Sequence, residues 1–217
     1  MADMTQLLSY FLHIDQHLAQ LIAWAGGWSY VVLFGVIFCE TGLVVMPFLP
    51  GDSFLFAAGS LAALGLLNLP LLIGTLFAAA FLGNEVNYWV GRKIGLKLLE
   101  GPFKRFIDKR HIVKAEAFFA KHGVMAVIFA RFIPIVRTIV PFTAGISRMN
   151  PKQFTLYNAV GAALWIFLFT LGGFVFGNIP SVKENFSVVV LAIIFISILP
   201  PVIEWWRERK IDSTNIH

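Results

Sequence analysis

The sequence predicts an all-α polytopic membrane protein, an inverted repeat with two opposed re-entrant helical hairpins and about four full transmembrane helices. Of its 217 residues, 58% are hydrophobic and only 13% are charged, whereas soluble chains average about 25% charged residues. Apolar runs of about 20 residues are typical of helices rather than of the short alternating segments of an outer-membrane barrel. Because no flexible linker or low-complexity tract divides the chain, a single membrane domain over residues 1–217 is expected.

An amphipathic helix is predicted at residues 5–26, where apolar residues recur at helical spacing and Asp15 lies opposite them. Such a helix lies on the membrane surface. Within it, His13 and His17 have the i, i+4 spacing of metal ligands. Because no third ligand is nearby, interfacial histidines are expected instead. Neither a metal nor another cofactor is predicted.

The first repeat is predicted to cover residues 28–95. Trp28 and Tyr30 begin its first span as an aromatic belt at the membrane interface. The next apolar run, at about residues 46–67, is too short and too interrupted by proline and glycine for a full crossing, which indicates a re-entrant segment. A long span over residues 69–95 completes this repeat.

Residues 96–122 are predicted to form a basic cytoplasmic loop. From Arg92 to Lys121 there are nine Lys and Arg against three acids, so this stretch carries +6 while the whole chain carries +5. The positive-inside rule places such a loop in the cytoplasm. Nucleic-acid binding is the other interpretation of a basic segment, but beside membrane spans no nucleic-acid partner is expected. Residues 107–121 are predicted to form a second interfacial helix.

The second repeat is predicted to cover residues 123–177, with a re-entrant segment at about 124–148. Pro151 then opens a span, since proline suits the first turn of a helix. A last span at residues 186–206 leads into a basic cluster at residues 207–210. Both basic segments agree with one path through the membrane, which leaves the N- and C-termini in the cytoplasm.

The two halves share a pattern of spacing. From Asn68 to Gly91 is 23 residues, and from Asn150 to Gly173 is also 23. An Ala-Gly pair lies upstream of each long span. Because the two spans begin on opposite sides of the membrane, the repeat has the inverted topology of secondary transporters, whose sites form where broken segments meet. Chance similarity between glycine-rich membrane helices is the alternative.

Two acids lie within the apolar surroundings of the first repeat. Glu40 is near the end of the first span, and Asp52 follows Pro50 and Gly51, where a half-helix is expected to begin. Ionisable groups in hydrocarbon are expensive and therefore indicate function. A buried carboxylate can exchange protons near neutral pH, which makes both acids candidates for proton coupling. For Asp52, capping of the half-helix is the alternative.

Two arginines occupy the corresponding stretch of the second repeat. Arg131 and Arg137 are six residues apart, so on an unbroken helix they would point in opposed directions, but Pro134 between them allows both to face one cavity. Arginine presents a planar fork to phosphate or carboxylate, which makes the pair a candidate site for an anionic head group. The alternatives are ion pairs with Glu40 and Asp52, or extension of Arg131 to the cytoplasmic surface.

Further candidates lie on the long span of the first repeat. Glu85 either contacts the site or pairs with Arg92, and both possibilities are left open. Trp89 and Trp165 are interpreted as packing or lipid-facing aromatic residues. The additional site candidates on this span are Glu85, Asn87, Tyr88 and Arg92. The residues expected to shape the hairpins are Pro47, Pro50, Gly51, Gly59, Pro134, Pro141 and Gly145.

These residues belong to motifs that resemble the DedA family of bacterial inner-membrane proteins, part of the wider VTT-domain superfamily. The matching motifs are Phe38-Cys39-Glu40-Thr41-Gly42, Pro47-Phe48-Leu49-Pro50-Gly51-Asp52-Ser53, Asn87-Tyr88-x-x-Gly91-Arg92, Ala130-Arg131-Phe132-Ile133-Pro134-Ile135-Val136-Arg137-Thr138, Ala144-Gly145 and Tyr157-Asn158-x-x-Gly161-Ala162-x-x-Trp165. The resemblance covers nearly the whole chain in order. One departure is Asn84, where similar chains often carry aspartate, so a role for the neighbouring acid Glu85 is in doubt.

The resemblance implies an inner-membrane location, two re-entrant hairpins that face each other, and a role in envelope homeostasis that depends on the proton motive force. Some members are implicated in returning undecaprenyl phosphate across the membrane, and eukaryotic ones in scrambling phospholipids. Glu40, Asp52, Arg131 and Arg137 match positions that are regarded as essential in the family.

No enzyme signature such as Gly-x-Ser-x-Gly or His-Glu-x-x-His occurs, so a non-enzymatic function is expected. The leading hypothesis is a proton-coupled transporter or flippase of an anionic lipid, with undecaprenyl phosphate as the first candidate. The alternatives are a small-ion or solute/proton antiporter and a non-transporting membrane scaffold. The expected partners are protons and a membrane lipid, either a polyprenyl phosphate or a phospholipid, and self-association is left open.

Overall fold

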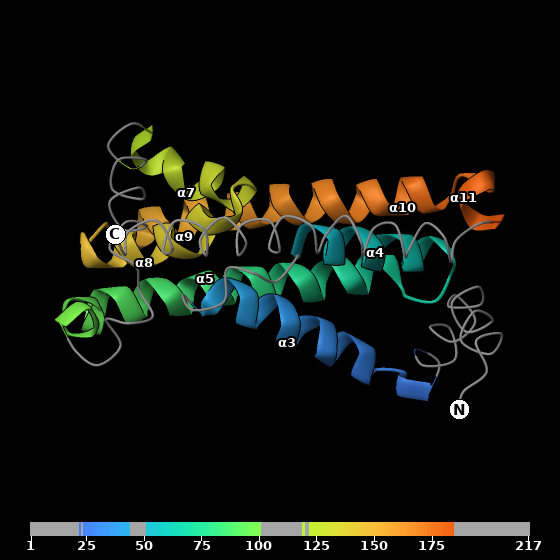
Figure 1. Ribbon diagram of the computed structural model, residues 1–217, viewed down its shortest axis with the longest axis horizontal. Helices are drawn as coiled ribbons and strands as arrows, with labels where there is room; N and C mark the ends of the chain where they lie inside the picture. Colours follow the sequence, from blue (N-terminus) through green and yellow to red (C-terminus); the bar gives the residue numbers. More distant parts are fainter. Residues whose placement is uncertain (1–21, 23, 44–50, 101–118, 120–121, 185–217) are drawn as a thin grey trace, which may run out of the picture. The chain divides into compact units, whose positions relative to one another are not determined.

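The computed structural model describes residues 22, 24–43, 51–100, 119 and 122–184, and these are helical apart from short turns (Figure 1). No strand occurs among them, which confirms the all-α class. The elements in chain order are α3 (Trp28–Gly42), α4 (Gly51–Ala63), α5 (Leu69–Glu100), η2 (Gly123–Met125), α7 (Ala126–Phe129), η3 (Ala130–Phe132), α8 (Pro134–Ile146), α9 (Pro151–Ile166), η4 (Phe167–Leu171), α10 (Gly172–Gly177) and α11 (Pro180–Glu184).

Two of the described helices are long and apolar enough to cross a membrane. They are Leu69–Lys93, with 25 residues, and the continuous helix Pro151–Gly177, with 27 residues. At 1.5 Å per residue these are about 38 and about 40 Å long, more than the ~30 Å of hydrocarbon in a bilayer. Two of the predicted spans are therefore present. The first predicted span corresponds to α3, which has only 15 residues.

Several predicted elements fall on residues that the structure does not describe. These are most of the amphipathic helix at 5–26, the prolines Pro47 and Pro50, most of the loop at 96–122 and the last span at 186–206.

The described residues divide into two units. The first contains residues 22, 24–26, 51–69 and 169–184, and the second contains residues 27–43, 70–100 and 122–168, with Phe119. The long helices contribute to both units, since α5 and the helix that starts at Pro151 each cross a unit boundary.

In the first unit, α4 packs against η4 and α10 at backbone distance. A Cβ atom on Gly59 would lie 2.0 Å from the carbonyl oxygen of Thr170, and one on Gly173 would lie 2.0 Å from the carbonyl oxygen of Phe56. The Ser60 hydroxyl donates a hydrogen bond to the carbonyl of Gly173 (3.0 Å). Gly59 thus lies inside α4 as a contact residue, and the chain turns instead at Gly65, which has φ +77°.

In the second unit, α5 and α8 meet in the same manner. A Cβ atom on Gly91 would lie 2.2 Å from the carbonyl oxygen of Phe142, and one on Gly145 would lie 2.1 Å from that of Tyr88. The C-terminal end of α3 also rests directly on α5, because Gly42 and Gly83 face each other there. These crossings bring polar side chains from α3, α5 and α8 close together.

The break that the sequence predicts in the second half lies at Ile133, which adopts an extended conformation (φ −119°, ψ 110°) between η3 and α8. Pro134 is the cause, since proline disfavours helical dihedrals in the residue before it and is itself suited to the first position of a helix. Pro141 lies within α8 without ending it. Arg131 and Arg137 therefore belong to different helical segments.

Candidate functional site

A cluster of buried polar side chains lies within the second unit. It is formed by the end of α3, the middle of α5, both sides of the break at Ile133, and α9. Its members are Glu40, Asn84, Asn87, Arg131, Arg137, Asn158 and Trp165. Buried polar and charged groups require partners, so the contacts of each one determine what the cluster can do.

Glu40 and Arg137 form a buried ion pair. Arg137 Nη2 donates a hydrogen bond to Glu40 Oε1, and the Glu40 side chain is 1% exposed. Glu40 is held in place because the last turn of α3 is fixed: the Thr41 hydroxyl donates to the carbonyl of Ile37 (2.8 Å), and Gly42 rests against α5. Of the ion pairs that the sequence allowed for the two arginines, this is the one found within the second unit.

Arg131 has neutral partners instead. Its Nη2 donates to Asn158 Oδ1 (2.5 Å) and to the carbonyl of Ala80 (3.3 Å). With its amide oriented so that both polar atoms are satisfied, Asn84 accepts from the same nitrogen at 2.9 Å. The Arg131 side chain is 2% exposed, so it does not extend to the surface.

The charge of Arg131 therefore lacks a counter-ion among the residues that the structure describes. No carboxylate in that part of the chain forms an ion pair with it, and its Nε has no hydrogen-bond partner there. Gly161 leaves room for this side chain, since a Cβ atom there would lie 3.1 Å from Arg131 Cδ. A buried guanidinium of this kind is a candidate site for an anion.

Trp165 connects the two arginines. Its ring centroid lies 6.0 Å from Arg131 Cζ and 5.4 Å from Arg137 Cζ, within the range of cation–π interaction. At 1% exposure the indole is buried, so of the two interpretations given for Trp165 packing holds and lipid contact does not. Its spacing from Asn158, seven residues or two helical turns, is a signal that could have placed both residues on one face of a helix.

Asn87 joins three helices at the centre of the cluster. Its Nδ2 donates to the carbonyl of Thr138 in α8 (2.7 Å) and to that of Thr41 in α3 (3.3 Å). Its Oδ1 has no hydrogen-bond partner among the described residues. Thr41 follows Glu40 and Thr138 follows Arg137 in the chain. The Asn87 side chain therefore fixes the backbone next to both members of the ion pair.

Glu85 contacts the cluster through Asn158 and does not reach Arg131 directly. Its Oε1 accepts a hydrogen bond from Asn158 Nδ2 (3.0 Å), and Asn158 Oδ1 in turn accepts from Arg131. A Glu85–Arg92 pair is not formed. Asn84, the neighbouring residue, faces Arg131 itself. The two side chains that accept hydrogen bonds from Arg131 are thus the uncharged amides of Asn84 and Asn158, and the acid Glu85 lies beyond Asn158.

Tyr88 and Arg92 are not members of the cluster and contact the turn between α8 and α9. The Tyr88 hydroxyl donates to the carbonyl of Met149 (2.6 Å), and Arg92 Nη1 donates both to that hydroxyl (2.6 Å) and to the same carbonyl (2.8 Å). The Tyr88 ring stacks on Phe154 at a centroid distance of 4.2 Å. These contacts hold the turn between α8 and α9, where Arg148 has a positive φ of 54°. We assign them a structural role.

Asp52 lies in the first unit, in the first turn of α4, and is partly exposed. A negative charge is favourable at this position because of the helix dipole. The capping alternative for Asp52 thus has a structural basis. Glu40 lies at the C-terminal end of α3, where the helix dipole does not favour a negative charge.

The sequence was compared with known proteins, and the matches are to the same family that the motifs resemble. The model of the VTT domain matches residues 49–175. The chain is 47% identical over 206 residues to Protein DedA of Escherichia coli K12, with 94% of each chain covered. It is 39% identical over 178 residues to an uncharacterized membrane protein of Mycobacterium leprae, covering 82% of this chain and 80% of the relative.

A further relative is the inner membrane protein YghB of Escherichia coli K12, which is 35% identical over 187 residues, with 86% of this chain and 80% of the relative covered. No solved structure matches the chain. The family model covers more than half of the sequence, and the relatives match it over most of their length. The chain therefore belongs to the DedA family of VTT-domain membrane proteins.

Proposed function

We propose that this protein moves an anionic lipid across the bacterial inner membrane in a proton-linked manner, and that Arg131 binds the phosphate of the lipid. The observation that carries the proposal is the buried guanidinium of Arg131, which no described carboxylate neutralises, beside the Glu40–Arg137 pair. The location rests on the family and on the relatives named as inner membrane proteins.

The electrostatics of Arg131 favour an anionic ligand. A charge removed from water costs several kcal/mol unless an opposite charge or good hydrogen bonds compensate it. Around Arg131 the described compensation consists of one carbonyl and two side-chain amides. A phosphate would supply the missing charge and would accept hydrogen bonds from the planar guanidinium in two-point geometry.

The Glu40–Arg137 pair supplies a means of proton coupling. Protonation of Glu40 would remove the charge that Arg137 binds, and Arg137 would then be available to a phosphate held at Arg131. Both guanidinium carbons lie within 6.0 Å of the Trp165 ring centroid, and in this proposal the two arginines share one head group. In this mechanism, the proton and the anion bind together. Asp52 remains a second candidate for proton exchange.

Support for an inverted repeat comes from the glycine contacts of the two units. Gly91 faces the carbonyl of Phe142, and its counterpart in the repeat, Gly173, faces that of Phe56. Phe142 and Phe56 each lie three residues before the glycine of the corresponding Ala-Gly pair. The helix of each broken segment thus contacts the long span of the other half, as two exchanged re-entrant hairpins would. With this architecture we propose cytoplasmic N- and C-termini.

For the lipid itself we propose undecaprenyl phosphate, on the basis of the family resemblance. The test is movement of a fluorescently labelled polyprenyl phosphate across the membrane of proteoliposomes, with and without a pH gradient. Arg131→Gln should lower the apparent affinity about 30-fold or more, the equivalent of a lost charge-assisted contact. Lys152→Gln, at an exposed lysine of α9, is the matched control. Equal transport by the wild type and Arg131→Gln would refute the proposal.

A non-transporting scaffold is the second candidate, because Glu40 and Arg137 form a buried ion pair with each other and Asn87 ties their helices together. In a scaffold the sign of each charge is irrelevant so long as they remain paired. Cells that carry the exchanged pair, Glu40→Arg with Arg137→Glu, would then keep full function. A transporter that needs a carboxylate at one position and a guanidinium at the other would lose it.

A further inference from the structure

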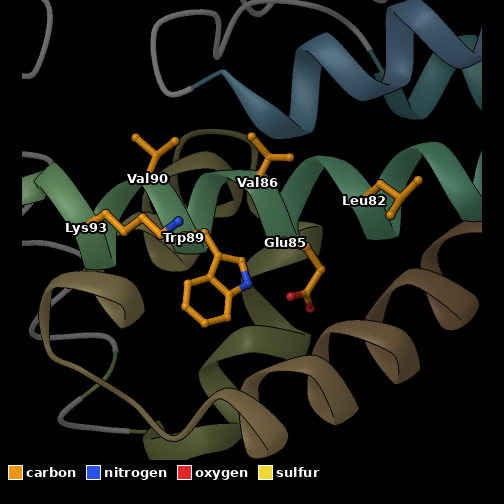
Figure 2. A pocket seen from close by; sticks show the side chains of 6 residues that line it. All are labelled: Leu82, Glu85, Val86, Trp89, Val90 and Lys93. Carbon is orange, nitrogen blue, oxygen red and sulfur yellow. The ribbon is translucent and has the colours of Figure 1, made fainter.

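A groove of about 350 Å³ follows one face of α5 within the second unit. Its lining residues are Leu82, Glu85, Val86, Trp89, Val90 and Lys93 (Figure 2). Glu85 and Trp89 are one helical turn apart, and Figure 2 shows both side chains extending to the same side of α5. Leu82, Val86 and Trp89 are 41 to 44% exposed on a helix that is long and apolar enough to span the membrane. On a membrane-spanning helix, an exposed apolar face of this kind would contact lipid.

The groove is apolar except for one carboxylate and one ammonium group. Glu85 and Lys93 are eight residues apart, or about 12 Å along the helix axis. The Lys93 amino group lies 5.9 Å from the centroid of the Trp89 ring, so it reaches back along the helix toward Glu85 (Figure 2). In the described part of the chain neither residue forms an ion pair, and Glu85 accepts its hydrogen bond through Oε1.

We infer that this groove binds a phospholipid whose head group carries a primary ammonium group. The ammonium group would lie at Glu85, the phosphate at Lys93, and an acyl chain against the apolar wall. A carboxylate on a lipid-facing surface is costly unless a cation meets it, and a primary ammonium group offers three hydrogen-bond donors. A quaternary ammonium group offers none, and a purely anionic lipid would leave Glu85 without an opposite charge.

The groove is connected to the cluster through a single side chain. Asn158 donates to Glu85 (3.0 Å) through its Nδ2 and accepts from Arg131 (2.5 Å) through its Oδ1. An ammonium group at Glu85 would compete with Asn158 for the carboxylate and would alter the hydrogen bonding of Arg131. The lipid in the groove is thus an effector rather than the transported molecule, and its binding does not depend on the proposed transport.

The test measures which lipids the purified protein retains. The protein is reconstituted in nanodiscs of equal parts phosphatidylethanolamine, phosphatidylcholine and phosphatidylglycerol, and the retained lipids are identified by native mass spectrometry. Phosphatidylethanolamine should be enriched about tenfold over both others, as one charge-assisted contact implies. Glu85→Gln should abolish the enrichment, and Lys93→Gln should lower phosphatidylethanolamine retention. Lys152→Gln is the matched control and should behave as the wild type does.

A further variant keeps the outcome interpretable. Glu85→Asp retains the carboxylate and should preserve the preference for phosphatidylethanolamine, which separates loss of the charge from loss of the fold. The measurement reads lipid retention and not transport, so a failure of the proposed transport would leave it unaffected. Enrichment that is absent in the wild type, or that persists unchanged in Glu85→Gln, would overturn the inference.

Discussion

Replacing Glu40 by glutamine keeps the shape of the side chain but removes the charge that Arg137 Nη2 faces. Both side chains are almost completely buried, so removal of either charge should lower the free energy of unfolding by about 3 kcal/mol, as when one partner of a buried pair is lost. Changing both residues to glutamine replaces the ion pair by two amides, so neither position carries a buried charge. We expect this double variant to be no less stable than either single variant. The coupling energy between Glu40 and Arg137 would then be about 3 kcal/mol.

The measurement is thermal unfolding of the purified protein in detergent, combined with the transport assay. A loss of 3 kcal/mol should lower Tm by about 6 to 12 °C for a chain of this length. The control cycle pairs Glu40→Gln with Lys152→Gln, whose effects should add within about 0.5 kcal/mol. Additive losses in the Glu40–Arg137 cycle would refute the energetic reasoning. Transport by the double variant at the wild-type rate would refute a role for these charges in transport.

Two further predictions concern the packing around the cluster. Gly91→Ala places a Cβ atom 2.2 Å from the carbonyl oxygen of Phe142 and should lower the free energy of unfolding by about 1 to 3 kcal/mol. Gly74→Ala, on the same helix with no atom within 4 Å of the new Cβ, should raise it by up to about 1 kcal/mol; equal Tm values for the two variants would contradict the close helix crossing. Tyr88→Phe removes the hydroxyl that links Met149 and Arg92 and should cost about 1 to 2 kcal/mol in thermal unfolding, without altering transport. A transport defect in Tyr88→Phe at full stability would contradict its structural role.

The helical class, the two long spans and the break before Pro134 were predictable because each has a local cause. Span length follows from the extent of the apolar run, and proline acts on its own neighbour. The role of Gly59, in contrast, depends on contacts with a distant part of the chain. A glycine that interrupts an apolar run permits either a turn or a close helix contact, and only the position of Thr170 against α4 shows that Gly59 makes the contact.

The charged members of the site were predictable because ionisable residues stand out in an apolar segment. Their pairing was not, because it depends on how α3 meets α8 across α5. Asn84 and Asn158 were not proposed as site residues, since an uncharged amide gives little signal in sequence, yet they are the side chains that contact Arg131. Trp165 was assigned to packing or lipid contact for a similar reason: an indole in a span is ordinary until the guanidinium groups beside it are known.

The two arginines have different partners. We therefore expect the charge of Arg137 to stabilise the fold and the charge of Arg131 to bind a ligand. Arg137 faces a carboxylate, so its loss leaves Glu40 without that cation and should destabilise the fold. Arg131 faces amides and a carbonyl, and glutamine can replace part of these hydrogen bonds without leaving a buried anion behind. Arg131→Gln should therefore cost less stability than Arg137→Gln and yet lose as much transport. If the two variants instead lost stability and transport in the same proportion, the unneutralised charge of Arg131 would have no function separate from the fold, and the scaffold would be the better interpretation.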